Sequence, residues 1–485
     1  MTNRYDEVIA EIAEYACRPG EVGTDEAFRT ARLALMDSIG CAFLALGFPA
    51  CRDFITTDGA LDNSRGQTPI PGTSHFKSAS QAAFDITTAI RWLDFNDTWL
   101  AKEWGHPSDN LGAILAATDS ISRSRRELGG HTFRVRDVLE MTIRAYEIQG
   151  ILALDNAFNR VGIDHVLLVK IASAAVAAAA MSDSDEEIVS SAVSHAWLDA
   201  TLRTYRHAPN TNARKSWAAG DAASRGVSLA EFALRGMGGC YSALTAPNYG
   251  FQDVWFEGQD VTLGRPLTSY VMENVLFKVK YPAEFHGQTA VEAGVALHPM
   301  VAHRLDEVRK VEIKTQEPAI RIIDKKGELN NPADRDHCIQ YMTAVALING
   351  DVTSDDYEDD ASNDPRIDAL REKMVVSERP EYTTEYLDPE KRSIANALTV
   401  KFDDGSSTDE VEVRFPIGHR TRRTEAIPLL FDKLNGNLES TFGDSDFVRE
   451  VGARFRKLEE LDEMPVTEFM DVLSLDTQVE RTAEN

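Results

Sequence analysis

The stretch DHVLLVKIASAAVAAAAM, residues 164–181, contains the most apolar run of the chain and predicts a helix inside a protein core. The run from Ile171 to Met181 is far shorter than the ~20 residues that a membrane-spanning helix needs. Its alanines carry little side-chain volume, which suits a helix that other helices approach closely. Such a helix needs neighbours that cover it, and the flanking sequence has to supply them.

The sequence around this stretch predicts one helix after another. Residues 25–46 repeat apolar side chains near helical spacing, and Asp25 can cap the start of that helix. A later segment opens with a capping-box pattern, Ser78 with Gln81. Helical periodicity continues to about Gly239 without strand-like alternation, so this half of the chain is expected to form a helical bundle.

The pattern changes after Tyr270, where strands are expected. Residues 307–316 alternate between apolar and polar side chains, which indicates a strand with one buried face. Residues 397–416 contain the clearest hairpin, two alternating runs joined by a turn that contains glycine. Helical periodicity returns from Pro428 onward.

The economical organisation is a mainly α protein with an inserted α+β domain. Residues 1–270, completed by residues 428–485, are expected to form a large helical domain. Residues 271–427 are expected to form the inserted domain. The boundary between two such domains is a favoured place for a ligand-binding cleft.

The balance of charges excludes some classes of partner. The chain has 51 Lys and Arg against 78 Asp and Glu, a formal net charge of −27. Neither a nucleic acid nor an anionic membrane is expected as the main partner, because no positive surface can form over the whole molecule. An anionic ligand would need cations gathered at one place.

The cysteines and the N-terminus indicate a cytoplasmic protein. Five cysteines are scattered along the chain without a C-x-x-C pair, which is typical of free thiols in a reducing compartment. This spacing offers no zinc site and argues against an iron–sulfur cluster, which usually needs several thiolates brought together. Residues 1–16 are acidic and amphipathic, unlike a signal or transit peptide.

Residues 91–110, RWLDFNDTWLAKEWGHPSDN, gather polar groups among tryptophans. If the preceding helix continues through them, Asp94 and Thr98 lie one turn apart on one face, and Arg91 lies a turn earlier. The alternative is an ordinary helix end capped by Asp and Asn. His106 precedes a proline in the turn before the next helix, where an imidazole can point into a cleft, although a turn histidine is more often incidental.

Two further segments of the helical half carry cations and imidazoles. Arginine binds a carboxylate through two parallel hydrogen bonds, so a basic segment in an acidic chain suits an anionic ligand. The alternative is that the segment is a solvent-exposed basic face. The basic segment contains Arg203, Arg206, His207, Arg214, Lys215 and Arg225. His165, before the apolar helix, is either a pocket residue or a satisfied core histidine.

The inserted domain adds two more polar groups. In chain order they contain Lys278, Lys280, His286, Asp336, His337 and Tyr341. The chain has no glycine-rich phosphate loop, no HExxH and no GxSxG motif. All these clusters together suit proton abstraction next to a carboxylate, with a polycarboxylate held by cations and with no metal or organic cofactor.

Long motifs along essentially the whole chain resemble the MmgE/PrpD family. They are RWLDFNDTW (91–99), FNRVGIDHVLLVK (158–170), LRTYRHAPNT (202–211), SYVMENVLFK (269–278), IRIIDKKGELNNPADRDHCIQYM (320–342) and RFPIGHR (414–420). The resemblance implies a helical domain with a smaller α+β lid domain, assembled as a homodimer. It also implies dehydration of a small tricarboxylate, 2-methylcitrate, to 2-methylaconitate in the methylcitrate cycle of propionate catabolism, without an iron–sulfur cluster.

The resemblance, extended to the related cis-aconitate decarboxylase, also implies pocket residues. Those that match are Asp94, Thr98, His106, His165, Lys215 and Tyr341. A further family lysine falls at Val279 in this chain, and we assign its role to the neighbouring Lys278. A decarboxylase or another hydratase of the same fold stays open as the alternative, and so does a metabolite-binding protein without catalysis.

These residues suggest a mechanism in which a substrate trianion lies between the two domains. The expected catalytic residues are His106, His165, Asp94 and Tyr341. The expected substrate-binding residues are Thr98, Lys215, Lys278, Arg203, Arg206 and His337. One histidine removes the proton α to a carboxylate, and the other histidine or the tyrosine protonates the departing hydroxyl. The sequence leaves open which histidine is the base, the substrate stereoisomer, the activity on citrate and the motion of the lid.

Overall fold

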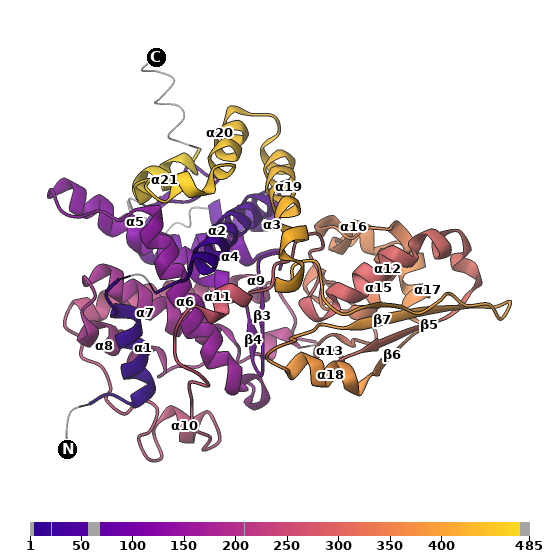
Figure 1. Ribbon diagram of the computed structural model, residues 1–485, viewed down its shortest axis with the longest axis horizontal. Helices are drawn as coiled ribbons and strands as arrows, with labels where there is room; N and C mark the ends of the chain where they lie inside the picture. The colour runs from indigo at the N-terminus through magenta and orange to yellow at the C-terminus, as the bar shows by residue number, and fades with distance from the viewer. Residues whose placement is uncertain (1–3, 21, 57–67, 208, 476–485) are drawn as a thin grey trace.

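The computed structural model describes residues 4–20, 22–56, 68–207 and 209–475, and it has two parts of different architecture (Figure 1). One part is helical and contains both ends of the described chain. The other part, salmon and orange in Figure 1, contains a four-stranded sheet with its own helices. The predicted fold class, mainly α with an α+β part, is confirmed.

The alanine-rich helix α7 (Val166–Met181) lies inside the helical part, with every residue before Met181 buried. Its neighbours include α6 (Val135–Asp155), α8 (Glu186–Ala196) and α9 (Arg214–Leu234). Small residues set the distance between α7 and α9. A Cβ on Gly226 would lie 2.9 Å from the backbone nitrogen of Ala174, so only glycine fits there. The predicted core helix is confirmed.

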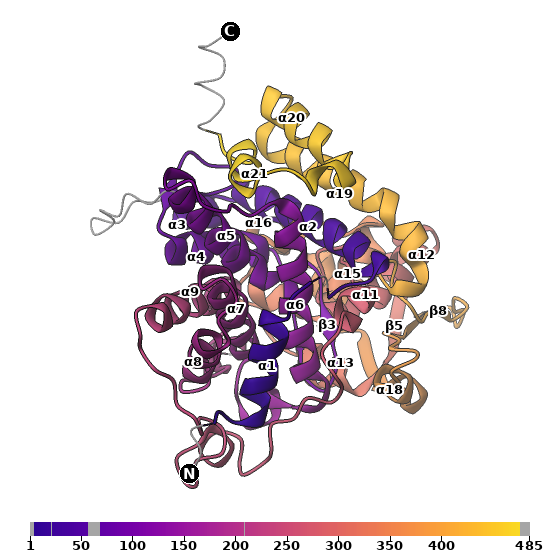
Figure 2. The same ribbon diagram turned by 60° about the vertical axis from the view of Figure 1, so that its left-hand side comes forward.

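The C-terminal segment returns to the helical part. Figures 1 and 2 show its yellow helices against the indigo helix α2, and α19 packs directly on α2. The other helices here are α1 (Glu7–Cys17), α2 (Asp25–Leu46), α3 (Pro49–Thr56), α4 (Ala79–Arg91), α5 (Leu111–Glu127), α10 (Phe251–Val254), α11 (Tyr270–Asn274), α19 (Arg423–Phe442), α20 (Asp446–Phe455) and α21 (Val466–Val472).

Among the described residues, no single helix has the length and apolar composition to cross a membrane. The pair α2 and α3 passes that test only together, and the two helices are bent by 96° at the break between them.

Two details of the helical part differ from the sequence prediction. Thr24, not Asp25, caps α2 with its side chain, and Ser78 precedes α4 without a side-chain capping bond. The helical half also contains two short antiparallel ribbons that were not expected. They are β1 (Thr68–Pro69) with β2 (Phe76–Lys77), and β3 (Trp99–Leu100) with β4 (Trp104–Gly105).

The sheet of the second part has the strand order β6-β5-β7-β8. Its strands are β5 (Val308–Thr315), β6 (Met374–Glu378), β7 (Asn396–Phe402) and β8 (Val411–Val413). The predicted hairpin is confirmed as β7 and β8, with Leu398 opposite Val411, whereas Phe415 lies beyond the strand. The strand β6, parallel to β5, was not predicted.

Helices complete the second part. Those with bounds in this region are α12 (Gln288–Val301), α13 (Glu317–Ile323), α14 (Pro332–Arg335), α15 (Ile339–Asn349), α16 (Asp359–Ser362), α17 (Pro365–Arg371) and α18 (Pro380–Leu387). Within the described part of the chain, one hydrophobic core has its members between Tyr5 and Val279 and between Ala426 and Leu473, and a second has its members between Tyr281 and Phe402. The domain limits proposed from the sequence, at residues 270 and 428, stay a prediction.

Candidate active site

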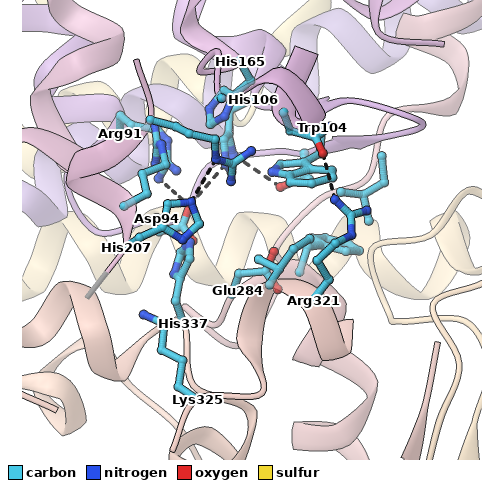
Figure 3. A pocket seen from close by; sticks show the side chains of 18 of the residues that line it. Arg91, Asp94, Trp104, His106, His165, His207, Glu284, Arg321, Lys325 and His337 are labelled. Carbon is cyan, nitrogen blue, oxygen red and sulfur yellow. Dashed lines mark hydrogen bonds and ion pairs between the residues drawn. The ribbon is translucent and has the colours of Figure 1, made fainter. Parts of the chain in front are cut away.

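A cavity of about 630 Å³ lies between the two parts of the molecule, and its lining is strongly basic (Figure 3). Among the residues that the structure describes, two carboxylates line it, Asp94 and Glu284. Seven cationic side chains of the described residues line it as well: Arg91, Arg160, Arg203, Arg206, Lys278, Arg321 and Lys325. In a chain with a net charge of −27, this excess of cations is a local feature that suits an anionic ligand.

Asp94 is the buried centre of the cavity's charge network. Arg91 and Lys278 both pair with its carboxylate, the latter at 2.9 Å, and His106 lies 3.3 Å from it through Nε2. The imidazole of His337 lies 3.9 Å away. Burial alone would raise the pKa of Asp94, but the surrounding cations hold it well below the ordinary value. The carboxylate therefore stays ionised.

The turn that carries Asp94 is not helical, which corrects the expectation of a helix running through Thr98. Helix α4 ends at Arg91, and Asp94 has a left-handed φ of 50°. Thr98 instead exchanges two backbone hydrogen bonds with Leu276, at 2.8 and 3.0 Å. The turn thereby fixes the helical part to the segment that leads into the second part.

A buried lysine holds this turn from behind. The ammonium of Lys433, on α19, donates to the backbone carbonyls of Phe95 and Lys278, each at 2.8 Å. Its third partner is the buried carboxylate of Asp37, at 2.7 Å. The two hydrogen bonds fix backbone next to Asp94 and at Lys278.

The ring of His106 is held so that one of its nitrogens, Nε2, can exchange a proton with a ligand in the cavity. Its Nδ1 lies 2.6 Å from the backbone carbonyl of Asp97, which can only accept, so Nδ1 carries the hydrogen. This leaves Nε2 as the proton-accepting atom of the neutral ring, next to Asp94. Burial, and then the charge of Arg91, lower the pKa of His106 well below its ordinary value.

His165 has the opposite arrangement. Its Nδ1 lies 3.5 Å from the carboxylate of Asp164, which Arg206 binds at 2.5 and 3.2 Å. Its Nε2 has no hydrogen-bond partner among the described residues, and the side chain lines the cavity. Burial lowers the pKa of His165 well below its ordinary value, although Asp164 opposes the shift. The Nε2 of His165 is thus open to a ligand in the cavity, and the centroid of its ring lies 6.0 Å from that of His106.

Lys215 connects to the cavity through its contacts with Asp336 and His337. The Lys215 ammonium lies 2.6 Å from both oxygens of Asp336 and 2.9 Å from Nδ1 of His337. Burial lowers the pKa of Lys215 to about 8 against the attraction of Asp336. Lys215 is not among the residues that line the cavity, whereas His337 is. Lys215 therefore positions His337 instead of facing the cavity itself.

The donor atoms of Asp94, Asp336 and His337 lie within 4.8 Å of one another, close enough to be considered as ligands of a metal ion. Two ammonium groups already neutralise the carboxylates: Lys278 on Asp94 and Lys215 on Asp336. A further cation would have to compete with both lysines, so the charges here do not call for a metal.

The far wall of the cavity brings together cations from both parts. Arg203, from the helical part, and Arg321, from α13, lie 5.4 and 5.3 Å from the ring centre of Trp104. Arg321 also donates to the side chain of Asn159, at 2.8 Å, and this amide is fixed in turn by the buried carboxylate of Glu103. Figure 3 shows Trp104 and Arg321 on the right and Arg91 and Asp94 on the left.

The sequence matches known protein domains along most of its length. Residues 10–264 match the MmgE/PrpD N-terminal domain, and residues 281–453 match the MmgE/PrpD C-terminal domain. The chain belongs to the MmgE/PrpD family.

Relatives are similar to this MmgE/PrpD protein over nearly the whole chain. The 2-methylcitrate dehydratase of Escherichia coli strain K12 is 51% identical over 475 residues, which cover 96% of this chain and 97% of that protein. The 2-methylcitrate dehydratase of Cupriavidus necator is 49% identical over 476 residues, 97% of each chain. The mitochondrial 2-methylcitrate dehydratase of Yarrowia lipolytica is 48% identical over 472 residues, 96% of this chain and 90% of that protein.

The structure brings most of the predicted site residues to one cavity. Those that line it are Asp94, Thr98, His106, His165, Arg203, Arg206, Lys278 and His337. Lys215 lies behind this lining. Tyr341 is the correction: it is not a lining residue, and its hydroxyl donates to the backbone carbonyl of Asp356 at 2.7 Å. Its proton is already bound away from the cavity, so a role as the acid does not fit.

Sequence reasoning about this MmgE/PrpD protein gave no role to several lining residues. Glu284 is one, and its carboxylate is fixed 2.8 Å from Nδ1 of His286. Arg321 and Lys325 are others, although both stand in the quoted motif of residues 320–342. A cluster of cations in that motif was the available signal. The sequence did not show that this segment crosses to the helical part.

Proposed function

We propose that this MmgE/PrpD protein is a 2-methylcitrate dehydratase, which removes water from 2-methylcitrate to give 2-methylaconitate. The observation that carries the proposal is a cation-lined cavity that contains two imidazoles, His106 and His165. Identity of about 50% to 2-methylcitrate dehydratases over nearly the whole chain supports the choice of substrate.

The substrate carries three carboxylates, which cations of the cavity lining can hold. We assign this binding to Arg203, Arg321 and Lys325, because Arg206 is already engaged by Asp164. A guanidinium binds a carboxylate through paired hydrogen bonds, which fixes the orientation of the substrate as well as its position.

The elimination needs a base and an acid at the two sites of bond breaking. His165 is the base: its free Nε2 takes the proton from the carbon next to a carboxylate, and the C–H electron pair forms the C=C bond. The charge that develops on that carboxylate is stabilised by a nearby cation such as Lys278. The C–O bond then breaks, and the hydroxyl leaves as water with a proton from Nε2 of His106.

Asp94 and Thr98 support His106 in this scheme. Asp94, 3.3 Å from Nε2, stabilises the imidazolium that must form before the proton is given away. The Thr98 hydroxyl lies 3.3 Å from Nδ1 and helps to fix the ring. The negative charge of a bound trianion opposes the lowering of the His106 pKa and so favours the protonated acid in the complex.

The wider setting follows from the same proposal. The reaction belongs to the methylcitrate cycle of propionate catabolism and takes a small tricarboxylate, with no nucleic acid or membrane as partner. We propose a cytoplasmic homodimer that uses no metal and no organic cofactor. The lysines on Asp94 and Asp336 support the metal-free chemistry.

The test is turnover by chelator-treated enzyme. Incubation with 2-methylcitrate should raise the ultraviolet absorbance of a conjugated C=C bond, and the product should be 2-methylaconitate. Release of carbon dioxide from cis-aconitate, without dehydration of 2-methylcitrate, would place the protein among the decarboxylases of the same fold. Tight binding of both compounds without any product would contradict an enzymatic role.

A further inference from the structure

One region of the cavity wall is apolar although most of the other lining side chains are polar or charged. Leu100, Trp104 and Phe285 line the cavity and are buried, and the half-buried Ile322 lines it beside them. These four residues, here called the apolar patch, belong to or pack against one hydrophobic cluster. They come from both parts of the molecule, namely the ribbon β3–β4, the short helix η4 (Phe285–Gly287) and α13.

The apolar patch lies next to the cations that we assign to the substrate's carboxylates. The guanidinium groups of Arg203 and Arg321 both approach the ring of Trp104, and Ile322 directly follows Arg321 on α13. A carboxylate held by either arginine places its neighbouring carbon atoms against the apolar patch. Arg91 and Asp94 stand on the other side in Figure 3.

An apolar wall does not stabilise carboxylate or hydroxyl groups, because these groups lose their hydrating water there without gaining a hydrogen bond. The methyl group of 2-methylcitrate gains from contact with such a wall, and citrate lacks this group. We propose that the apolar patch is the binding subsite for the methyl group, and that Ile322 makes the enzyme prefer 2-methylcitrate to citrate. This inference rests on the dehydratase function proposed above.

The test compares two substrates in one variant. A single methyl group in a hydrophobic pocket changes kcat/KM by about 10–200-fold. Ile322→Ala should therefore lower the ratio of kcat/KM for 2-methylcitrate to that for citrate by about tenfold, with kcat/KM for citrate within about twofold of wild type. Ile322→Val, which keeps most of the volume and guards against misfolding, should shift the ratio in the same direction by less.

Ile394 provides the matched control. It belongs to the same hydrophobic cluster and is buried, but it does not line the cavity. Ile394→Ala should lower stability and leave the substrate ratio unchanged. An unchanged ratio in both Ile322 variants, with an active wild-type enzyme, would overturn the methyl subsite alone. A wild-type enzyme that turns over neither substrate would overturn the proposed function and the subsite with it.

Discussion

His106 and His165 both line the cavity, and each belongs to a group of one histidine, one aspartate and one arginine. The two groups differ in the orientation of the imidazole relative to the aspartate. Each imidazole has an aspartate beside it, and each aspartate is paired with an arginine: Arg91 with Asp94, and Arg206 with Asp164. At His106 the carboxylate faces Nε2, whereas at His165 it faces Nδ1 and leaves Nε2 free.

The difference shows how one set of side chains can produce an acid and a base. A carboxylate beside the reactive nitrogen favours the protonated ring, so His106 suits proton donation. A carboxylate behind the ring orients it and raises its basicity while the reactive nitrogen stays open, so His165 suits proton abstraction. The following predictions test the two halves of this comparison, first separately and then together.

The largest effect is expected at the base. Replacing His165 by Asn keeps a polar side chain but removes the proton acceptor, and kcat should fall by about 10²–10⁴-fold. Substrate binding, followed by calorimetry, should change little because the cations remain. A kcat near that of the wild type would remove His165 from the mechanism.

Lys433, which holds the turn that carries Asp94 beside His106, can be removed separately. Lys433→Met leaves Asp37 buried without a counter-charge and releases the backbone at Phe95, so the free energy of unfolding should fall by about 3–5 kcal/mol. Denaturant titration measures this change. The double variant Lys433→Met with Asp37→Asn should recover part of the loss, and an unaltered midpoint in the single variant would show that the ion pair does not hold this turn.

A smaller effect is expected behind the base. Asp164→Asn keeps the shape but removes the negative charge that raises the pKa of His165. The imidazole becomes a weaker base, so kcat should drop by about tenfold and the acidic limb of its pH profile should move to lower pH. A limb that stays in place would mean that another group titrates there.

The mildest prediction concerns pH. Burial lowers the pKa of both histidines in the folded protein below the ordinary 6.5, so at low pH the unfolded chain binds more protons than the folded one. The contribution of these groups to stability is therefore complete above pH 6.5 and declines as the pH falls below it. Thermal unfolding between pH 7 and pH 5 measures the decline, and the variant His165→Asn should show a shallower one.

Part of this picture was available from the sequence. The helical core and the β7–β8 hairpin follow from periodicity, since the side-chain pattern alone selects helix or strand. The grouping of Asp94 with Arg91 was also expected, but for the wrong reason: a turn, not a continuing helix, brings the two together.

Contacts across the cavity could not be predicted in this way. Arg321 reaches Asn159 over a separation of 162 residues, and Lys433 reaches Phe95 over 338. No local pattern encodes such pairs. The orientation of each imidazole depends on similar contacts, such as the carbonyl of Asp97 behind His106, so the sequence named both histidines without assigning the base.

The most direct measurement is exchange of the abstracted hydrogen in heavy water. Incubation of 2-methylcitrate with His165→Asn should give no deuterium at the carbon that bears the methyl group, because no base removes its hydrogen. His106→Asn should still exchange that hydrogen while it dehydrates slowly, since its base is intact. Exchange that survives in His165→Asn and disappears in His106→Asn would contradict the assignment and reverse the two roles.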